Sequence, residues 1–127
     1  MEYYFSRNVN MPFDEAIEKV TEALKEEGFG VLTDIDVAAT MKKKLDKDMP
    51  AYRILGACNP QFAFQAIQTE DKVGVMLPCN VIVQDKGDHV EVSAVDPMAS
   101  MQAIRNEKLA EIAGEVKARL QKVVETL

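Results

Sequence analysis

Hydrophobic and polar positions alternate at the start of the chain and then change to a helical spacing. From Tyr3 to Arg7 the alternation has a period of two, which predicts an opening strand. From Phe13 to Leu24 the apolar residues recur at spacings of three and four, with acidic residues between them, which predicts an amphipathic helix. Gly28 is a natural stop after the end of that helix.

The alternation returns over residues 29–35 and predicts a second strand. On a regular strand, Val31 and Ile35 lie on one face and Asp34 lies on the other. Asp36 is placed to cap a short helix that follows. The apolar stripe of this short helix consists of Val37, Met41 and Leu45.

A third strand is predicted over residues 52–58, and a helix begins directly after it. Asn59 is a preferred N-cap residue, and proline is favoured at the first helical position because its missing N–H would have no partner there. We therefore expect Asn59 to cap a helix that starts at Pro60 and stops near Thr69.

Residues 73–84 are rich in Val, Ile and Leu, which predicts a fourth strand. Pro78 interrupts this segment and indicates a bulge or an unpaired edge position, because proline has no N–H to donate. Residues 85–88 have the composition of a turn, and residues 89–95 alternate again. Together the segments predict a hairpin.

The last thirty residues carry an apolar stripe at spacings of three and four, which predicts a long amphipathic helix. The stripe consists of Leu109, Ile112, Val116, Leu120, Val123 and Leu127. Its heptad-like spacing fits contact with a second subunit, but packing on the sheet of the same chain explains the stripe more simply.

The order of predicted elements is β-α-β-α-β-α-β-β-α, and 127 residues fit a single domain spanning 1–127. Helices both interrupt and follow the strands. The economical arrangement is an α+β fold with an antiparallel or mixed sheet, covered on one face by helices that include the long C-terminal one.

Charge and composition exclude several classes of partner. The formal net charge is −6, which disfavours nucleic acid, because affinity for phosphate backbones comes from clustered Lys and Arg. No apolar stretch approaches the length of a membrane span, and the N-terminus does not read as a signal peptide. We therefore expect a cytoplasmic protein with no membrane or nucleic-acid partner.

Four segments resemble the signatures of a prokaryotic family called domain of unknown function 302. The resemblance covers essentially the whole chain, with the segments in the expected order. The segments are Gly28 to Val37, Tyr52 to Pro60, Leu77 to Val83, and Val95 to Pro97.

The resemblance implies a two-layer α+β sandwich, similar to the β-α-β(4)-α arrangement of TATA-binding-protein-like domains. It also implies a homodimer. It implies no reaction, substrate or cofactor, and the fold analogy does not transfer DNA binding to an acidic chain.

Cys58 and Cys79 are the first candidates for chemistry. Cys58 precedes the helix start at Asn59, where a helix N-terminus would stabilise a thiolate. If their strands are neighbours, the two thiols approach each other, and a reversible disulfide or soft-metal site becomes geometrically possible. The alternative is that both are small buried apolar groups.

A zinc site that adds His89, the one histidine, has no ligand-spacing motif to support it.

Three polar residues complete the candidate binding set. Asn59 and Asn80 offer side-chain amides, although Asn59 has a competing role as a helix cap. Asp96 precedes Pro97 and fits a turn.

The sequence contains no GxSxG, Walker or HExxH motif, so we predict no catalytic residues, metal or cofactor. The favoured interpretation is a non-enzymatic, dimeric domain that binds a small apolar or thiol-reactive ligand in a groove between the sheet and the long helix. The alternative is a thiol-based redox or metal-handling protein that uses Cys58 and Cys79. A further alternative is a structural dimer whose surface binds another protein.

Overall fold

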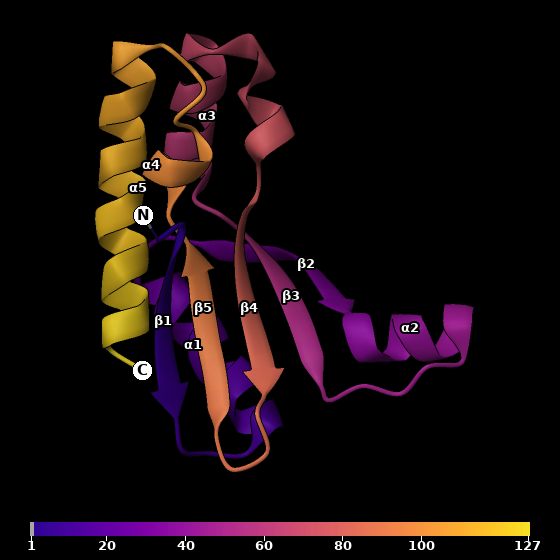
Figure 1. Cartoon of the computed structure of the whole chain (residues 1–127). Helices are drawn as coiled ribbons and strands as arrows, with labels where there is room; N and C mark the ends of the chain where they lie inside the picture. Colours follow the sequence, from indigo (N-terminus) through magenta and orange to yellow (C-terminus); the bar gives the residue numbers. More distant parts are fainter. Residues whose placement is uncertain (1) are drawn as a thin grey trace.

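Five strands form one antiparallel sheet in the order β1-β5-β4-β3-β2 (Figure 1). The computed structural model describes residues 2–127. The strands are β1 (Tyr4–Val9), β2 (Gly30–Asp36), β3 (Tyr52–Cys58), β4 (Cys79–Asp85) and β5 (Val90–Val95). The sheet is thus antiparallel throughout, one of the two arrangements that the order of elements allowed.

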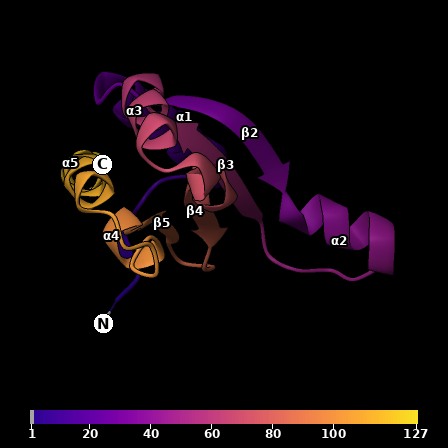
Figure 2. The same ribbon diagram turned by 90° about the horizontal axis from the view of Figure 1, so that it is seen from above.

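The two longest helices, α1 and α5, cover one face of the sheet (Figures 1 and 2). The helices are α1 (Phe13–Glu26), α2 (Val37–Leu45), α3 (Pro60–Thr69), α4 (Pro97–Ser100) and α5 (Glu107–Glu125), with a 3-10 helix η1 (Asp71–Met76). With α2 and α3 as insertions, the order is β-α-β(4)-α. The α+β sandwich expected from the sequence is confirmed.

The long helix α5 buries its apolar stripe within its own chain. Leu120 and Val123 are fully buried and belong to the same core as Val20 of α1 and Val92 of β5. The heptad-like spacing therefore serves packing on the sheet and on α1. Figure 1 shows α5 running along the β1 side of the sheet.

A bulge in β2 overturns the predicted facing of its side chains. Val31 pairs with Ala57, and the next pair is Thr33 with Gly56, so Leu32 is an extra residue. An extra residue shifts the period-two pattern by one. Asp34 consequently shares the covered face with Val31, whereas Ile35 lies on the opposite face.

The prediction of a strand over 73–84 is wrong in its first half. Residues 71–76 form η1, and the strand begins only at Cys79. Val73 is fully buried in a small second core beside α3 and the start of α5. Pro78 precedes the strand because proline cannot donate to a ladder, so it marks the beginning of β4 rather than a bulge within it.

The sheet face that points away from α1 and α5 has no helix over it in the described part of the chain; we call it the open face (Figure 1). The cross-strand register places these side chains on it: Tyr4, Ser6, Ile35, Tyr52, Ile54, Asn80, Ile82, Gln84, Glu91, Ser93 and Val95. Helix α2 stands off the edge of the sheet beyond β2, as both views show. None of the helices in residues 2–127 has the length and apolar composition needed to cross a bilayer.

Candidate functional site

A cavity of about 320 Å³ lies between α3, the first half of α5 and the adjoining end of the sheet. Its wall is almost entirely apolar, and none of the residues that line it is charged. The lining residues include Phe29, Leu32, Ala57, Cys58, Asn59, Phe62, Ala63, Ala66, Leu77, Cys79, Met101, Leu109, Ile112, Ala113 and Val116. The predicted groove between sheet and long helix therefore corresponds to a real hollow in the fold.

Small side chains on facing elements leave this hollow open. Ala63 and Ala66 project from α3, Ala113 projects from α5, and Ala57 lies at the end of β3. Protein interiors are normally packed to the density of organic crystals, so a volume of this size is not a routine packing defect. It falls at the lower end of the range typical for small-molecule sites, roughly 300–1,000 Å³.

Both cysteines line this cavity, because β3 and β4 are neighbours and their adjoining ends meet there. Cys79 pairs across the ladder with Ala57, the residue next to Cys58. Both thiols are free, Cys79 buried and Cys58 half-buried. The two residues therefore lie at the same end of neighbouring strands, one position out of register with each other.

Burial raises the pKa of the Cys79 thiol to about 11, and the nearby Cys58 adds a smaller effect in the same direction. A thiol with this pKa is almost wholly protonated at neutral pH and is a poor nucleophile. Cys79 therefore contributes a neutral, polarisable wall to the cavity.

Asn59 occupies the N-cap position of α3, but its side chain does not cap the helix. Its Nδ2 donates instead to the carbonyl oxygen of Glu27 at 3.3 Å, across to the end of α1. The predicted position is right and the predicted side-chain role is wrong. Asn59 lines the cavity, and its Oδ1 makes no hydrogen bond within residues 2–127.

Arg119 of α5 strengthens the same junction. Its guanidinium donates to the Glu27 carbonyl at 3.1 Å and lies over the ring of Phe62, 5.1 Å from the ring centroid. Gly28, which follows Glu27, has φ of +87°, and a Cβ there would lie 3.0 Å from Asn59 Nδ2. The junction therefore holds α1, α3 and α5 together beside the cavity.

Asn80 and Asp96 lie outside the cavity. Asn80 is exposed on the open face, in a shallow depression that also contains Tyr4, Tyr52 and Glu91. Asp96 is buried, and its carboxylate accepts from the N–H groups of Met98 and Ala99 at the start of α4. Lys117 pairs with that carboxylate at 3.2 Å, so Asp96 joins α4 to α5.

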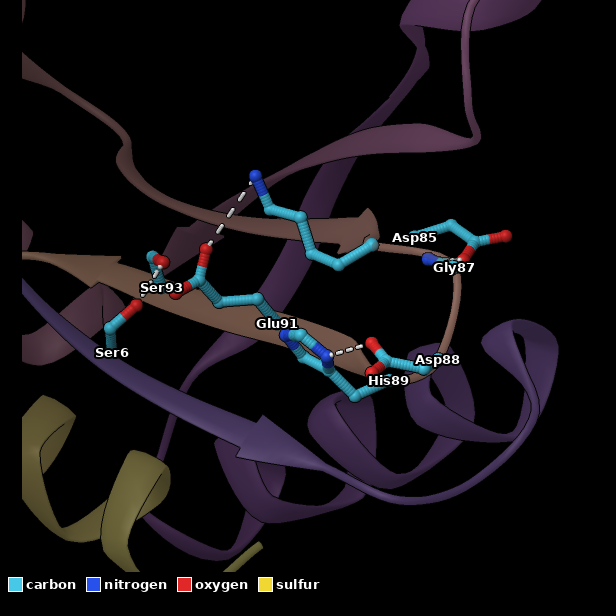
Figure 3. Close-up of polar contacts among 8 residues, drawn as sticks. Ser6, Asp85, Gly87, Asp88, His89, Glu91 and Ser93 are labelled. Carbon is cyan, nitrogen blue, oxygen red and sulfur yellow. Dashed lines mark hydrogen bonds and ion pairs between the residues drawn. The ribbon is translucent and has the colours of Figure 1, made fainter.

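His89 lies at the hairpin end of the sheet (Figure 3). Cys79 is at the opposite end of β4. A strand of seven residues spans roughly 20 Å, so the two cannot share a metal ion. His89 Nδ1 instead pairs with Asp88 at 2.6 Å. Across residues 2–127, no three His, Cys, Asp or Glu side chains gather in a way that would hold a metal.

Sequence reasoning missed the contributions of Phe62, Ala63 and Arg119. The sequence predicted a helix from Pro60 to near Thr69 but assigned no role to the side chains within it. Arg119 lies 60 residues from Asn59, and no local pattern connects them.

Comparison with known proteins supports the resemblance read from the sequence. The model of the family described as "Domain of unknown function DUF302" matches residues 5–127. A crystal structure of an uncharacterized conserved DUF302 protein from Bacillus stearothermophilus is similar to this chain, with a TM-score of 0.92 and 28% sequence identity. The similarity covers 98% of each chain. No curated protein matches the chain. The match over residues 5–127 shows that the chain belongs to the DUF302 family.

Proposed function

We propose that this protein binds a small, uncharged and largely apolar molecule in the cavity between α3 and α5. The observation that carries the proposal is the cavity itself: about 320 Å³, lined by apolar side chains and by no charged one. A charged ligand would lose its hydration without gaining a counter-charge, and this cost disfavours carboxylates and phosphates.

Asn59 indicates that the ligand has one polar group. Asn59 is the one lining residue with a side-chain amide, and because its Nδ2 donates to Glu27, its Oδ1 is left to accept a hydrogen bond from a ligand. An acceptor in an apolar pocket favours a ligand with one donor, such as an alcohol, because few well-placed polar groups fix a ligand's orientation. The ligand class that fits is therefore a medium-chain or cyclic apolar alcohol.

Fluorescence of the neutral probe N-phenyl-1-naphthylamine tests the proposal, with 1-octanol and octanoate as a matched pair of competitors. We expect the probe to brighten with the protein and octanol to displace it more effectively than octanoate. Ala63→Phe fills the cavity, and we expect it to weaken probe binding at least about tenfold, as loss of the burial of a few methylene groups implies.

Ala110→Phe is the matched control, because Ala110 is exposed on α5 and does not line the cavity. Circular dichroism would verify that both variants fold. No probe binding to the wild type, or equal binding by Ala63→Phe and the wild type, would contradict the proposal.

Thiol chemistry through Cys58 and Cys79 is a second candidate, favoured by the presence of both thiols in one cavity wall. The raised pKa of Cys79 speaks against that residue as the nucleophile. Iodoacetamide labelling of the native protein, followed for each cysteine by mass spectrometry, distinguishes the outcomes. Labelling of either thiol at the rate of a free peptide thiol supports the candidate, and labelling of both only after unfolding excludes it.

A further inference from the structure

Helix α2 is only partly covered by its own chain, because Val37, Ala38, Thr40 and Met41 are half-buried and its other residues are exposed. It is nine residues long, and none of its residues is fully buried. Leu45, at the end of its apolar stripe, is 62% exposed, and Met49 just beyond it is 37% exposed. Isolated helices shorter than about 12–15 residues are marginal in water, and most helical stability in proteins comes from packing an apolar face. The C-terminal end of the α2 stripe therefore lacks an apolar contact within the chain, whereas Val37 and Met41 are half-buried.

The charge of the α2 segment is opposite to that of the rest of the protein. Four lysines and two aspartates give residues 37–50 a net charge of +2, so the remainder of the −6 chain carries −8. Lys42 is paired with Asp46 and Asp48 at 3.0 and 3.2 Å. In residues 2–127, no ion-pair partner lies beside Lys43, Lys44 or Lys47, so these three are available to an acidic surface.

The open face of the sheet provides such a surface on every copy of the chain. A depression of about 450 Å³ on it contains Tyr4, Tyr52 and Ile82, beside the carboxylate of Glu91. Figure 3 shows Glu91 on the sheet and Asp85 and Asp88 at the adjoining β4–β5 hairpin. The nearest cation, Lys86, is 4.0 Å from Glu91, so the hairpin keeps an excess of negative charge.

We propose that α2 is a dimerisation arm that packs on the open face of a second copy of this chain, with its lysines against the acidic β4–β5 hairpin of that copy. Each chain carries both the arm and its receptor surface, so two copies can bind reciprocally about a two-fold axis. This proposal is independent of the cavity, because neither surface includes α3 or α5.

Sedimentation velocity of the full chain from micromolar to submillimolar concentrations tests the proposal. We expect a reversible monomer–dimer equilibrium in the wild type. Leu45→Glu places a charge on the apolar stripe, and we expect it to raise the dimer dissociation constant at least about tenfold. Raising the salt concentration should also weaken the dimer, because exposed charges are screened.

Val75→Glu is the matched control, since Val75 is 81% exposed on η1 and lies on neither proposed surface. We expect it to dimerise like the wild type. A strictly monomeric wild type would overturn the proposal, and so would a dimer that Leu45→Glu leaves unchanged. A photo-crosslinker at position 45 should react with the open face of the other copy, at Tyr4, Tyr52, Ile82 or Glu91, and exclusive crosslinks elsewhere would also overturn the proposal.

Discussion

Gly56 is a residue at which the tertiary structure leaves no room for a side chain. A Cβ there would overlap Thr33 Oγ1 on the neighbouring strand and would lie 2.8 Å from Pro78 Cγ. Thr33 would have to change its side-chain rotamer, and because Pro78 Cγ belongs to a ring closed on the backbone, the start of β4 would have to move. In the sequence, Gly56 is only a glycine within a predicted strand. The residues that exclude a side chain there, Pro78 and Thr33, are 22 and 23 positions away in the chain.

We predict that Gly56→Ala lowers the free energy of unfolding by about 2 kcal/mol, the usual cost of overpacking a filled site. Gly30→Ala is the control, because no atom lies within 4 Å of a Cβ at Gly30. We expect that control to stay within about 0.5 kcal/mol of the wild type. Urea unfolding measures both, and equal midpoints for the two variants would contradict the prediction.

Cys79 connects burial with a pH dependence of stability. Its pKa is raised to about 11 in the folded chain against an ordinary value of 9.0, because burial disfavours the thiolate. Between about pH 9 and pH 11, the Cys79 thiol therefore stays protonated in the folded chain but ionises in the unfolded chain. The stabilisation from the neutral buried thiol is complete below about pH 9 and is lost as the pH rises toward 11.

We predict that the stability difference between the wild type and Cys79→Ala narrows by roughly 2 kcal/mol between pH 8 and pH 11. Urea unfolding of both proteins across that range measures the difference, and the other titrating groups cancel in the comparison. Parallel stability curves would show that Cys79 ionises normally in the folded protein.

At the scale of elements, the joint between α1, α3 and α5 depends on groups at helix ends. The Glu27 carbonyl, at the end of α1, accepts from Asn59 at 3.3 Å and from Arg119 at 3.1 Å. The carbonyls at the end of a helix have no partner within that helix, so donors from other elements satisfy them. Local sequence predicted where α1 and α3 begin and end, but not which helix would provide a donor to another.

We predict that Asn59→Asp destabilises the protein by about 1–2 kcal/mol, because a carboxylate cannot donate to Glu27 and would face its carbonyl. Asp and Asn are about equally good N-caps, so the change would be nearly neutral if Asn59 acted as a cap. Asp36→Asn is the control. Asp36 accepts from Ala39 N at 2.9 Å, and an amide oxygen can accept the same bond. Thermal unfolding of the two variants distinguishes a capping role of Asn59 from its role as a donor to Glu27. An Asn59→Asp variant as stable as Asp36→Asn would refute the donor role.

For the whole molecule, the two proposed binding surfaces lie on different parts of the fold. The cavity lies between α3 and α5, whereas the open face and α2 belong to the other side and the far edge of the sheet (Figures 1 and 2). The cavity wall carries no charge, and the α2 segment and the acidic hairpin carry opposite charges. Octanol binding and dimerisation should therefore respond to different variants, Ala63→Phe and Leu45→Glu respectively.

The sequence by itself determined the elements that depend on local periodicity and capping. The extent of α1, the presence of a long C-terminal helix and of the β4–β5 turn, the capping of α2 by Asp36 and the α+β class all follow from residues close together in the chain. The meeting of Cys58 and Cys79 followed from one further assumption, that their strands are neighbours.

Only the tertiary structure decided the features that depend on distant segments. The bulge at Leu32 moved Asp34 to the covered face, where Arg53 donates to it from Nε at 2.7 Å. Residues 71–76 form η1 because Val73 is buried beside α3 and α5, although its neighbours favour a strand. Burial, register and side-chain partners are set by contacts across the whole chain, whereas periodicity reports only which residues favour burial. For that reason the groove could be expected from the sequence, but its wall could be known only once the chain had folded.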